Sequence, residues 1–236
     1  MRILDFMSIF GEIFMEIIPE HPFIDRQGHI QTFKVTVNNI GQKEFSILVY
    51  YGVAGIGKTY LGKKFLNHLG EYNLKYKYQK VIWASIYLQL DEHRDKTTML
   101  MAFKNELHKK SKINFPAFEI AHAIYWKKAN PEIPIRKKNY LFFEGSDAFN
   151  VLYGVATQIS YFSLVPAVAR LLNSLPNDRR NCWTKRTEEE LKQLSEKEPS
   201  KIKEMLPYFW ALDLNNYLKD TSQSVVLFID TYEALW

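Results

Sequence analysis

Gly52-Val53-Ala54-Gly55-Ile56-Gly57-Lys58-Thr59 is the stretch of this sequence that most narrowly limits the fold. Its glycines permit backbone angles and a close approach that a Cβ atom would prevent. Successive backbone N–H groups in such a loop converge on an anion, and the helix that follows adds the positive end of its dipole. Lys58 would reach the β- and γ-phosphates, and the Thr59 hydroxyl would coordinate Mg²⁺. Together with Tyr60, which comes next, the stretch predicts a site for the phosphates of ATP or GTP.

The residues on either side have the pattern that such a loop requires. Residues 44–51 form a short apolar run rich in β-branched and aromatic side chains, which predicts a buried strand. After the loop, apolar residues at helical spacing predict a helix over 59–69, with Gly70 as its natural stop. Strand, glycine loop and helix in this order are the context of a P-loop, or Walker A motif.

Two further strands are expected, at 81–88 and at 224–229. The later one reads Ser-Val-Val-Leu-Phe-Ile, which is apolar on both faces, as parallel strands covered by helices tend to be. The charged segment 91–96 predicts a loop, and the sequence from there to about residue 220 is mostly helical. The elements predict an α/β fold: a parallel sheet flanked by helices, of the ASCE type of P-loop NTPase, with a helical insert over about 91–223.

Three helices of this insert have recognisable signals. Asn114 is a candidate cap with Pro116 just inside the helix, and Thr187 with Glu190 suggests a capping box that opens a helix over 188–197. Helical spacing continues over 202–218, where Pro207 is a candidate kink.

The domain boundaries follow from the same patterns. Residues 1–18 are apolar but interrupted by acids, so we expect a helical N-terminal segment over 1–21 and a P-loop NTPase domain over 22–236. Only three strands are confidently predicted, and the sequence ends six residues after Asp230. We therefore expect a fragment or a truncated gene product whose domain is incomplete at the C-terminus.

Acidic residues follow the last predicted strand. Asp230 stands at its C-terminal end, where a carboxylate can hold Mg²⁺ directly or through water, as in a Walker B motif. Glu233 lies three residues later, where it would orient or deprotonate the attacking water, or simply complement the dipole of a helix start. Thr231 follows Asp230 directly, at a position where many P-loop ATPases have a glutamate. The candidate catalytic residues are Lys58, Asp230 and Glu233, and the general base stays open.

Composition excludes several other classes of function. The formal net charge is +5, and basic residues gather in short runs at 75–80, 109–112, 127–128 and 136–138. We interpret these runs as solvated surface, because no nucleic-acid module accompanies them and nucleic acid is an unlikely partner. Cys182 is the only cysteine, which rules out an internal disulfide and cysteine-based zinc sites and fits a cytoplasmic protein. The six histidines share no metal-site spacing.

One uncharged stretch, 148–169, is long enough to span a bilayer. Its amide and hydroxyl side chains keep its mean hydropathy low for lipid. We expect two buried helices there, the second starting near Pro166, and no membrane partner.

The order of these motifs resembles that of a known family. Phe23-Ile24-Asp25-Arg26, then the glycine loop, then the segment FIDTYEALW at 228–236 resemble the STAND class of P-loop NTPases, signal-transducing ATPases related to AAA+ proteins and NLR-type receptors. In particular, the chain looks like prokaryotic members with C-terminal tetratricopeptide-like repeats. Residues 115–118 and 123–128 resemble their helical insert, so the resemblance covers most of 22–236.

The resemblance implies an ATP-driven switch in signalling or defence. In such a switch ADP holds a closed state, and the ATP form oligomerises and activates an effector. The implied cofactors are ATP/ADP and Mg²⁺, and the implied partners are further copies of the chain and a C-terminal repeat or effector region. By the same likeness, Arg26 lies in the loop beside the adenine and helps to sense the nucleotide, although Asp25 replaces the glycine usual before it.

Two other functions remain open. A different P-loop enzyme, such as a GTPase or a kinase, would use the same loop, but a GTPase normally has Asp-x-x-Gly after its strand, where this chain has Asp230-Thr231-Tyr232-Glu233. The second of these other functions is that of a nucleotide-binding interaction module that does not hydrolyse the nucleotide.

Overall fold

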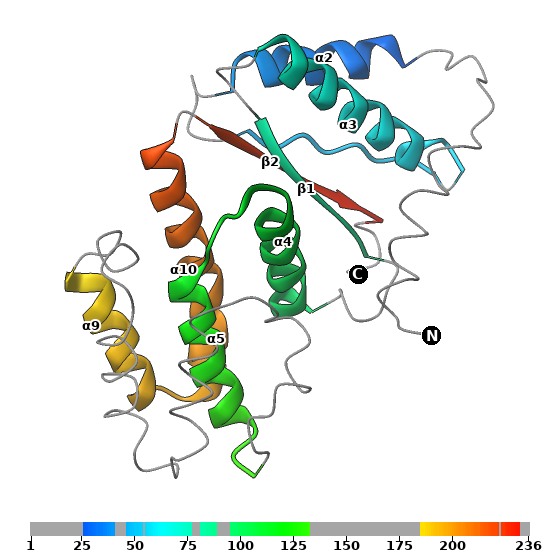
Figure 1. Ribbon diagram of the computed structural model, residues 1–236. Coiled ribbons are helices and arrows are strands. Elements are labelled where there is room, and N and C mark those ends of the chain that lie inside the picture. Colours follow the sequence, from blue (N-terminus) through cyan, green and yellow to red (C-terminus); the bar gives the residue numbers. More distant parts are fainter. Residues whose placement is uncertain are drawn as a thin grey trace, which may run out of the picture. The chain divides into compact units, whose positions relative to one another are not determined.

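The computed structural model describes a mixed α/β protein that is mostly helical and has a small parallel sheet of two strands (Figure 1). The described residues are 26–40, 46–53, 55–76, 81–88, 95–132, 185–221 and 223–231. The chain divides into two compact units, Met1–His68 and Leu69–Trp236, with the boundary inside helix α3. Each unit is described by itself.

The first unit contains helix α2 (Gln27–Asn38) and the beginning of α3 (Lys58–Lys75). Helix α2 was not predicted from the sequence. Its buried side is formed by Phe33 and Val37, which lie one helical turn apart. The Phe33 ring stacks on Phe65 of α3, with 4.2 Å between ring centroids. Such aromatic pairs add about 0.5–1.5 kcal/mol beyond the area they bury, so this contact fixes α2 on α3.

The prediction of a strand at 44–51 is wrong over residues 46–51, the part of this range that the structure describes. Residues 46–51 belong to neither a helix nor a strand, and the side chains of Ile47 and Val49 are 76% and 67% exposed. β-Branched composition suits a pleated, half-buried surface, but a strand also needs a neighbour for its backbone groups. Among the described residues the only two strands pair with each other.

Helix α3 is longer than the sequence suggested. It begins at Lys58, passes through Gly70 without stopping, and ends at Lys75. Glycine inside a helix costs only about 1 kcal/mol relative to alanine, and the burial of Leu69 and Tyr72 on either side of Gly70 offsets it. Near its end, Asn73 exchanges two hydrogen bonds of 2.7 and 2.8 Å with the backbone of Val81, the first residue of the sheet.

The sheet pairs β1 (Val81–Tyr87) with β2 (Ser224–Asp230) in parallel, from Val81 opposite Ser224 to Tyr87 opposite Asp230. Both strands were predicted at these positions, and the structure confirms them. One face of β1 lies in the core through Ile82, Ala84 and Ile86. The expectation that β2 is covered on both faces is not met among the described residues, because Leu227 and Ile229 are 39% and 40% exposed.

The described segments between the two strands are helical, as expected for the insert. They are α4 (Lys96–Ser111), α5 (Pro116–Ala129), α9 (Lys185–Gln193), the short 3₁₀ helix η5 (Leu194–Glu196) and α10 (Pro199–Asp220). In Figure 1, α5 and α10 lie side by side and α4 lies next to β1. Apolar residues of α4, α5 and α10 join the inner face of β1 in one core cluster.

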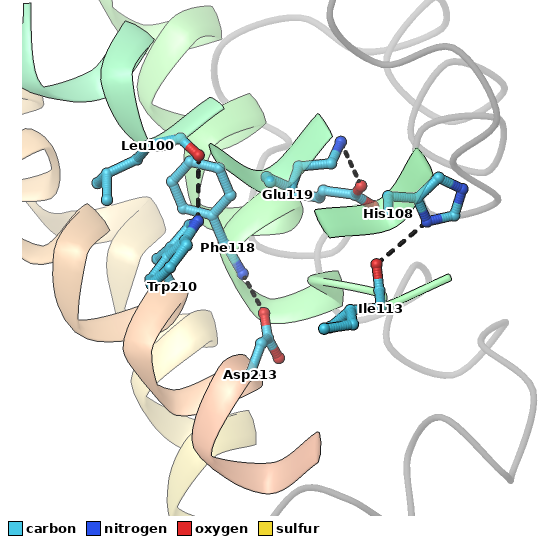
Figure 2. Close-up of polar contacts among 8 residues, drawn as sticks. Leu100, His108, Ile113, Phe118, Glu119, Trp210 and Asp213 are labelled. Atoms are coloured by element: carbon cyan, nitrogen blue, oxygen red, sulfur yellow. Dashed lines mark hydrogen bonds and ion pairs between the residues drawn. The ribbon is translucent and has the colours of Figure 1, made fainter. Parts of the chain in front are cut away.

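The N-terminus of α5 differs from the prediction. The cap position is Phe115 rather than Asn114, and Phe115 gives no side-chain cap, although Pro116 opens the helix as expected. The missing acceptor comes from α10, because the buried Asp213 carboxylate accepts a 2.9 Å hydrogen bond from the Phe118 N–H (Figure 2). A carboxylate there satisfies an N–H that the helix leaves without an intrahelical partner and complements the helix dipole.

The capping box predicted at Thr187 and Glu190 is also wrong. Helix α9 begins earlier, at Lys185, so Thr187 lies inside the helix, where it is buried. Glu190 instead accepts hydrogen bonds from Arg186, one turn away, and from the hydroxyl of Tyr208 on α10. The Glu190 carboxylate therefore binds Arg186 within α9 and Tyr208 of α10, instead of the helix N-terminus as a capping box requires. The helix expected at 202–218 lies within α10, which continues through Pro207.

Two of the expectations concern residues outside the described ranges: the N-terminal helical segment over 1–21 and the uncharged stretch 148–169. Of the helices that the structure does describe, none has the length and apolar character needed to cross a membrane.

A buried ion pair joins α4 to α5. The Lys104 ammonium lies 2.7 Å from the Glu119 carboxylate, and the two side chains are only 5% and 8% exposed (Figure 2). Nearby on α5, His122 lies in ring contact with Phe118 and Tyr125. Burial, and secondly the positive charge of Lys104, lower the pKa of His122 to about 4, against a weaker opposing effect of Asp95. The imidazole is therefore neutral at pH 7.

We expect Lys104→Met to lower the free energy of unfolding by about 3–5 kcal/mol, because it leaves the Glu119 carboxylate buried without its cation. The double variant Lys104→Met/Glu119→Leu should recover most of that loss, since it removes both charges. Urea unfolding followed by circular dichroism measures both. A single variant as stable as the wild type would contradict a buried pair.

We also expect the free energy of unfolding to fall as pH is lowered from about 6.5 to about 4. His122 has a depressed pKa in the folded chain, so the unfolded chain takes up a proton over this range that the folded chain does not, and stability is lost. In His122→Gln this part of the pH dependence should vanish. Unfolding curves of both proteins from pH 8 to pH 4 test it, and parallel pH profiles would show that His122 does not titrate as described.

Candidate phosphate-binding site

The glycine loop runs directly into the first turn of α3. Gly55 and Gly57 have φ values of 80° and 87°, in the left-handed region that side chains other than glycine avoid. The Leu61 N–H donates to the Gly57 carbonyl at 2.9 Å, so the helical ladder starts at the last glycine. The loop therefore ends at a helix N-terminus, whose backbone N–H groups and dipole favour an anion. Ala54 lies outside the described residues.

Lys58 folds back over this loop. Its ammonium donates to the Gly52 carbonyl at 2.8 Å and to the Val53 carbonyl at 3.4 Å. These contacts hold a positive charge at the loop. Thr59, the next residue, is exposed in the first turn of α3, and Tyr60 is half-buried with the Lys64 ammonium 5.4 Å from its ring centroid.

The described residues of the first unit contain no aspartate or glutamate. They contain five cations: Arg26, Lys34, Lys58, Lys63 and Lys64. The first turns of α2 and α3 accordingly contain no acid. Acids normally collect at helix N-termini because they complement the dipole. With no acid in either first turn, the N-terminal ends of α2 and α3 keep the partial positive charge of their dipoles, which suits an anion.

Arg26 contacts the glycine loop directly. It stands at the start of α2, and its guanidinium donates a 2.8 Å hydrogen bond to the Ile56 carbonyl, thirty residues along the chain. Of the candidate site residues, the structure thus brings Arg26 together with the loop. Sequence reasoning placed Arg26 near the adenine by resemblance and did not foresee this bond, because nothing in the local pattern links residues so far apart.

The other candidate residues belong to the second unit. Asp230 ends β2, and its carboxylate accepts a 2.9 Å hydrogen bond from the N–H of Thr231. Thr231 has a φ of 55°, which is unusual for a β-branched residue, and its hydroxyl accepts a hydrogen bond from the Leu88 N–H at 3.1 Å. Strand β2 therefore ends at Asp230, and Thr231 adopts a left-handed backbone conformation.

The roles of the acidic candidates stay predictions. Thr59 lies in the first unit and Asp230 in the second, so a shared Mg²⁺ site stays a prediction. Glu233 lies outside the described residues.

The left-handed angle at Gly55 gives a direct test of the loop. A Cβ added there would meet no atom within 4 Å, so Gly55→Ala probes backbone strain alone. We expect it to destabilise the chain by about 1 kcal/mol or more. Gly62→Ala is the matched control, because Gly62 lies inside α3 with equally open space, and alanine should stabilise the helix by about 0.5–1 kcal/mol. Urea unfolding measures both, and shifts of the same sign would contradict this loop geometry.

Comparison of the chain with protein-family models, with curated proteins and with solved structures gave no match.

Proposed function

We propose that this chain binds the phosphates of ATP or ADP together with Mg²⁺, and that it is the nucleotide-binding part of a STAND-type ATPase switch with a P-loop NTPase fold. The observation that carries the proposal is the glycine loop itself. It has two left-handed glycines and leads into the N-terminus of α3, whose first turn contains no acid. The motif order from Arg26 to Asp230 supports the choice of family.

In this proposal the loop N–H groups and the N-terminus of α3 bind the phosphate oxygens. Lys58 exchanges its hydrogen bonds to the Gly52 and Val53 carbonyls for the β- and γ-phosphates. The exchange favours the phosphates, because a phosphate oxygen attracts the ammonium with a net negative charge, whereas a carbonyl oxygen has only a partial charge. Thr59 supplies a hydroxyl for Mg²⁺, and Asp230 is the proposed carboxylate partner of the metal. The metal would neutralise charge on the phosphates.

We expect slow turnover. Thr231 directly follows Asp230, so that position offers no carboxylate to activate water, and Glu233 is the remaining candidate. The proposal is therefore of a switch that distinguishes bound nucleotides, rather than of an enzyme with a metabolic rate of about 10 s⁻¹.

Titration of the purified chain with a fluorescent ATP analogue in the presence of Mg²⁺ tests the proposal. We expect saturable binding that Lys58→Ala weakens by about 10–100-fold, because it removes hydrogen bonds from a charged donor worth about 1.5–3 kcal/mol. Lys64→Ala removes the same charge from an exposed residue of the same helix and should change the affinity less than threefold.

Competition then separates the alternatives. Displacement by ADP and ATP at concentrations far below those of GTP supports the ATPase switch, and the reverse order supports a GTPase. Equal binding by the wild type and Lys58→Ala, both folded, would overturn the phosphate role of the loop.

A further inference from the structure

The contact between Arg26 and Ile56 acts on one peptide group of the glycine loop. The guanidinium donates to the Ile56 carbonyl oxygen at 2.8 Å. This carbonyl and the Gly57 N–H belong to the same peptide, which is planar and trans, so they point in opposite directions. A guanidinium that holds the Ile56 oxygen on one side therefore holds the Gly57 N–H toward the other side. Gly57 is the left-handed residue immediately before α3.

Capping of its own helix does not explain why an arginine stands at this position. Arg26 is the N-cap residue of α2, yet it makes no side-chain cap hydrogen bond, and the first turn contains no acid. A cation beside a helix N-terminus is unfavourable by about 0.3–1 kcal/mol. The bond to the loop carbonyl is the contact that offsets this cost.

Helix α2 is a firm support for this contact, because it is fixed to the chain on both sides of the loop. After the loop, Phe65 of α3 stacks on Phe33. Before the loop, the Tyr50 ring packs against Phe65 and meets the edge of His29, with ring centroids 5.2 and 5.3 Å apart. The entry, the exit and, through Arg26, the middle of the loop are thus all attached to one helix.

We propose that Arg26 is a positioning residue that presents the Gly57 N–H to a bound phosphate by holding the Ile56 carbonyl. The inference rests on the proposed function, since it concerns the same loop. It differs from a role beside the base, because an arginine that acts through the loop strengthens the binding of every ligand that carries the phosphates. Its contribution is therefore the same for adenine and guanine nucleotides, and for polyphosphate without a base.

Calorimetric titration with Mg-ATP, Mg-GTP and inorganic tripolyphosphate tests this on the full chain. We expect Arg26→Gln to weaken all three by a similar factor of about ten, as for the loss of one positioned charged hydrogen bond. Arg26→Lys should recover part of the affinity, because an ammonium can donate to the same carbonyl. Lys34→Gln is the matched control, since it removes one charge from the same helix, and it should change affinity less than threefold.

A second measurement needs no ligand. The Gly57 amide resonance, followed by nuclear magnetic resonance, should shift in Arg26→Gln and stay in place in Lys34→Gln, because the lost hydrogen bond to the Ile56 carbonyl belongs to the same peptide group. Circular dichroism establishes that the variants are folded. An unshifted resonance in Arg26→Gln would overturn the proposal.

The ligands separate the remaining outcomes. Weaker binding of the nucleotides with unchanged tripolyphosphate binding would overturn the positioning role in favour of a contact with the base. Equal losses of affinity in Arg26→Gln and Lys34→Gln would show that overall charge causes the effect, and they would also overturn the positioning role. A wild-type chain that binds none of the three ligands would overturn the proposed function, whereas binding that Arg26→Gln leaves intact would overturn only the role of Arg26.

Discussion

The parallel pairing of β1 with β2 is the constraint on which the arrangement of the second unit depends. Val81 lies opposite Ser224, so 143 residues separate two backbone groups that are neighbours in the sheet. Parallel strands cannot be joined by a tight turn and need a crossover. The described helices α4, α5, α9 and α10 belong to that crossover, and their apolar residues share one core cluster with the inner face of β1. The buried polar groups of this layer, Lys104, Glu119 and Asp213, lie where its helices meet.

Sequence patterns correctly predicted those helices and strands that are determined by residues within the element itself. Both strands are short apolar runs, and they lie where they were expected, within one residue at their ends. Pro116 opens α5 because a missing N–H costs nothing at the first helical position. The predictions failed where the cause is distant in the sequence. Asp213 satisfies the N-terminus of α5 from 95 residues away, so no capping residue is needed beside Phe115.

The candidate site divides in the same way. The glycines, Lys58 and Thr59 were identified from one eight-residue stretch, because phosphate binding by backbone N–H groups needs those residue types at that spacing. The structure adds φ angles that only glycine adopts readily and an α3 that starts at Lys58. The Arg26 contact could not be predicted, because it depends on α2. The β-branched residues around Val37 have low helix propensity, so the sequence pattern did not indicate this helix. The apolar run before the loop was wrongly predicted to be a strand. Its composition suits a strand, but residues 46–51 have no strand partner among the described residues.

Several charged side chains among the described residues have defined hydrogen-bond or ion-pair partners. In the second unit carboxylates have defined tasks: Asp95 caps α4 and pairs with Lys203, Glu119 pairs with Lys104, and Glu190 holds Arg186 and Tyr208. In the first, the described cations Arg26 and Lys58 donate to carbonyl oxygens of the loop. A carbonyl is a weaker partner for a cation than a carboxylate or a phosphate. Lys58 and Arg26 contact different peptide groups of the loop, Lys58 at Gly52 and Val53 and Arg26 at Ile56. In the proposed function, a phosphate would therefore replace the carbonyls at Lys58 while Arg26 kept its bond to the loop.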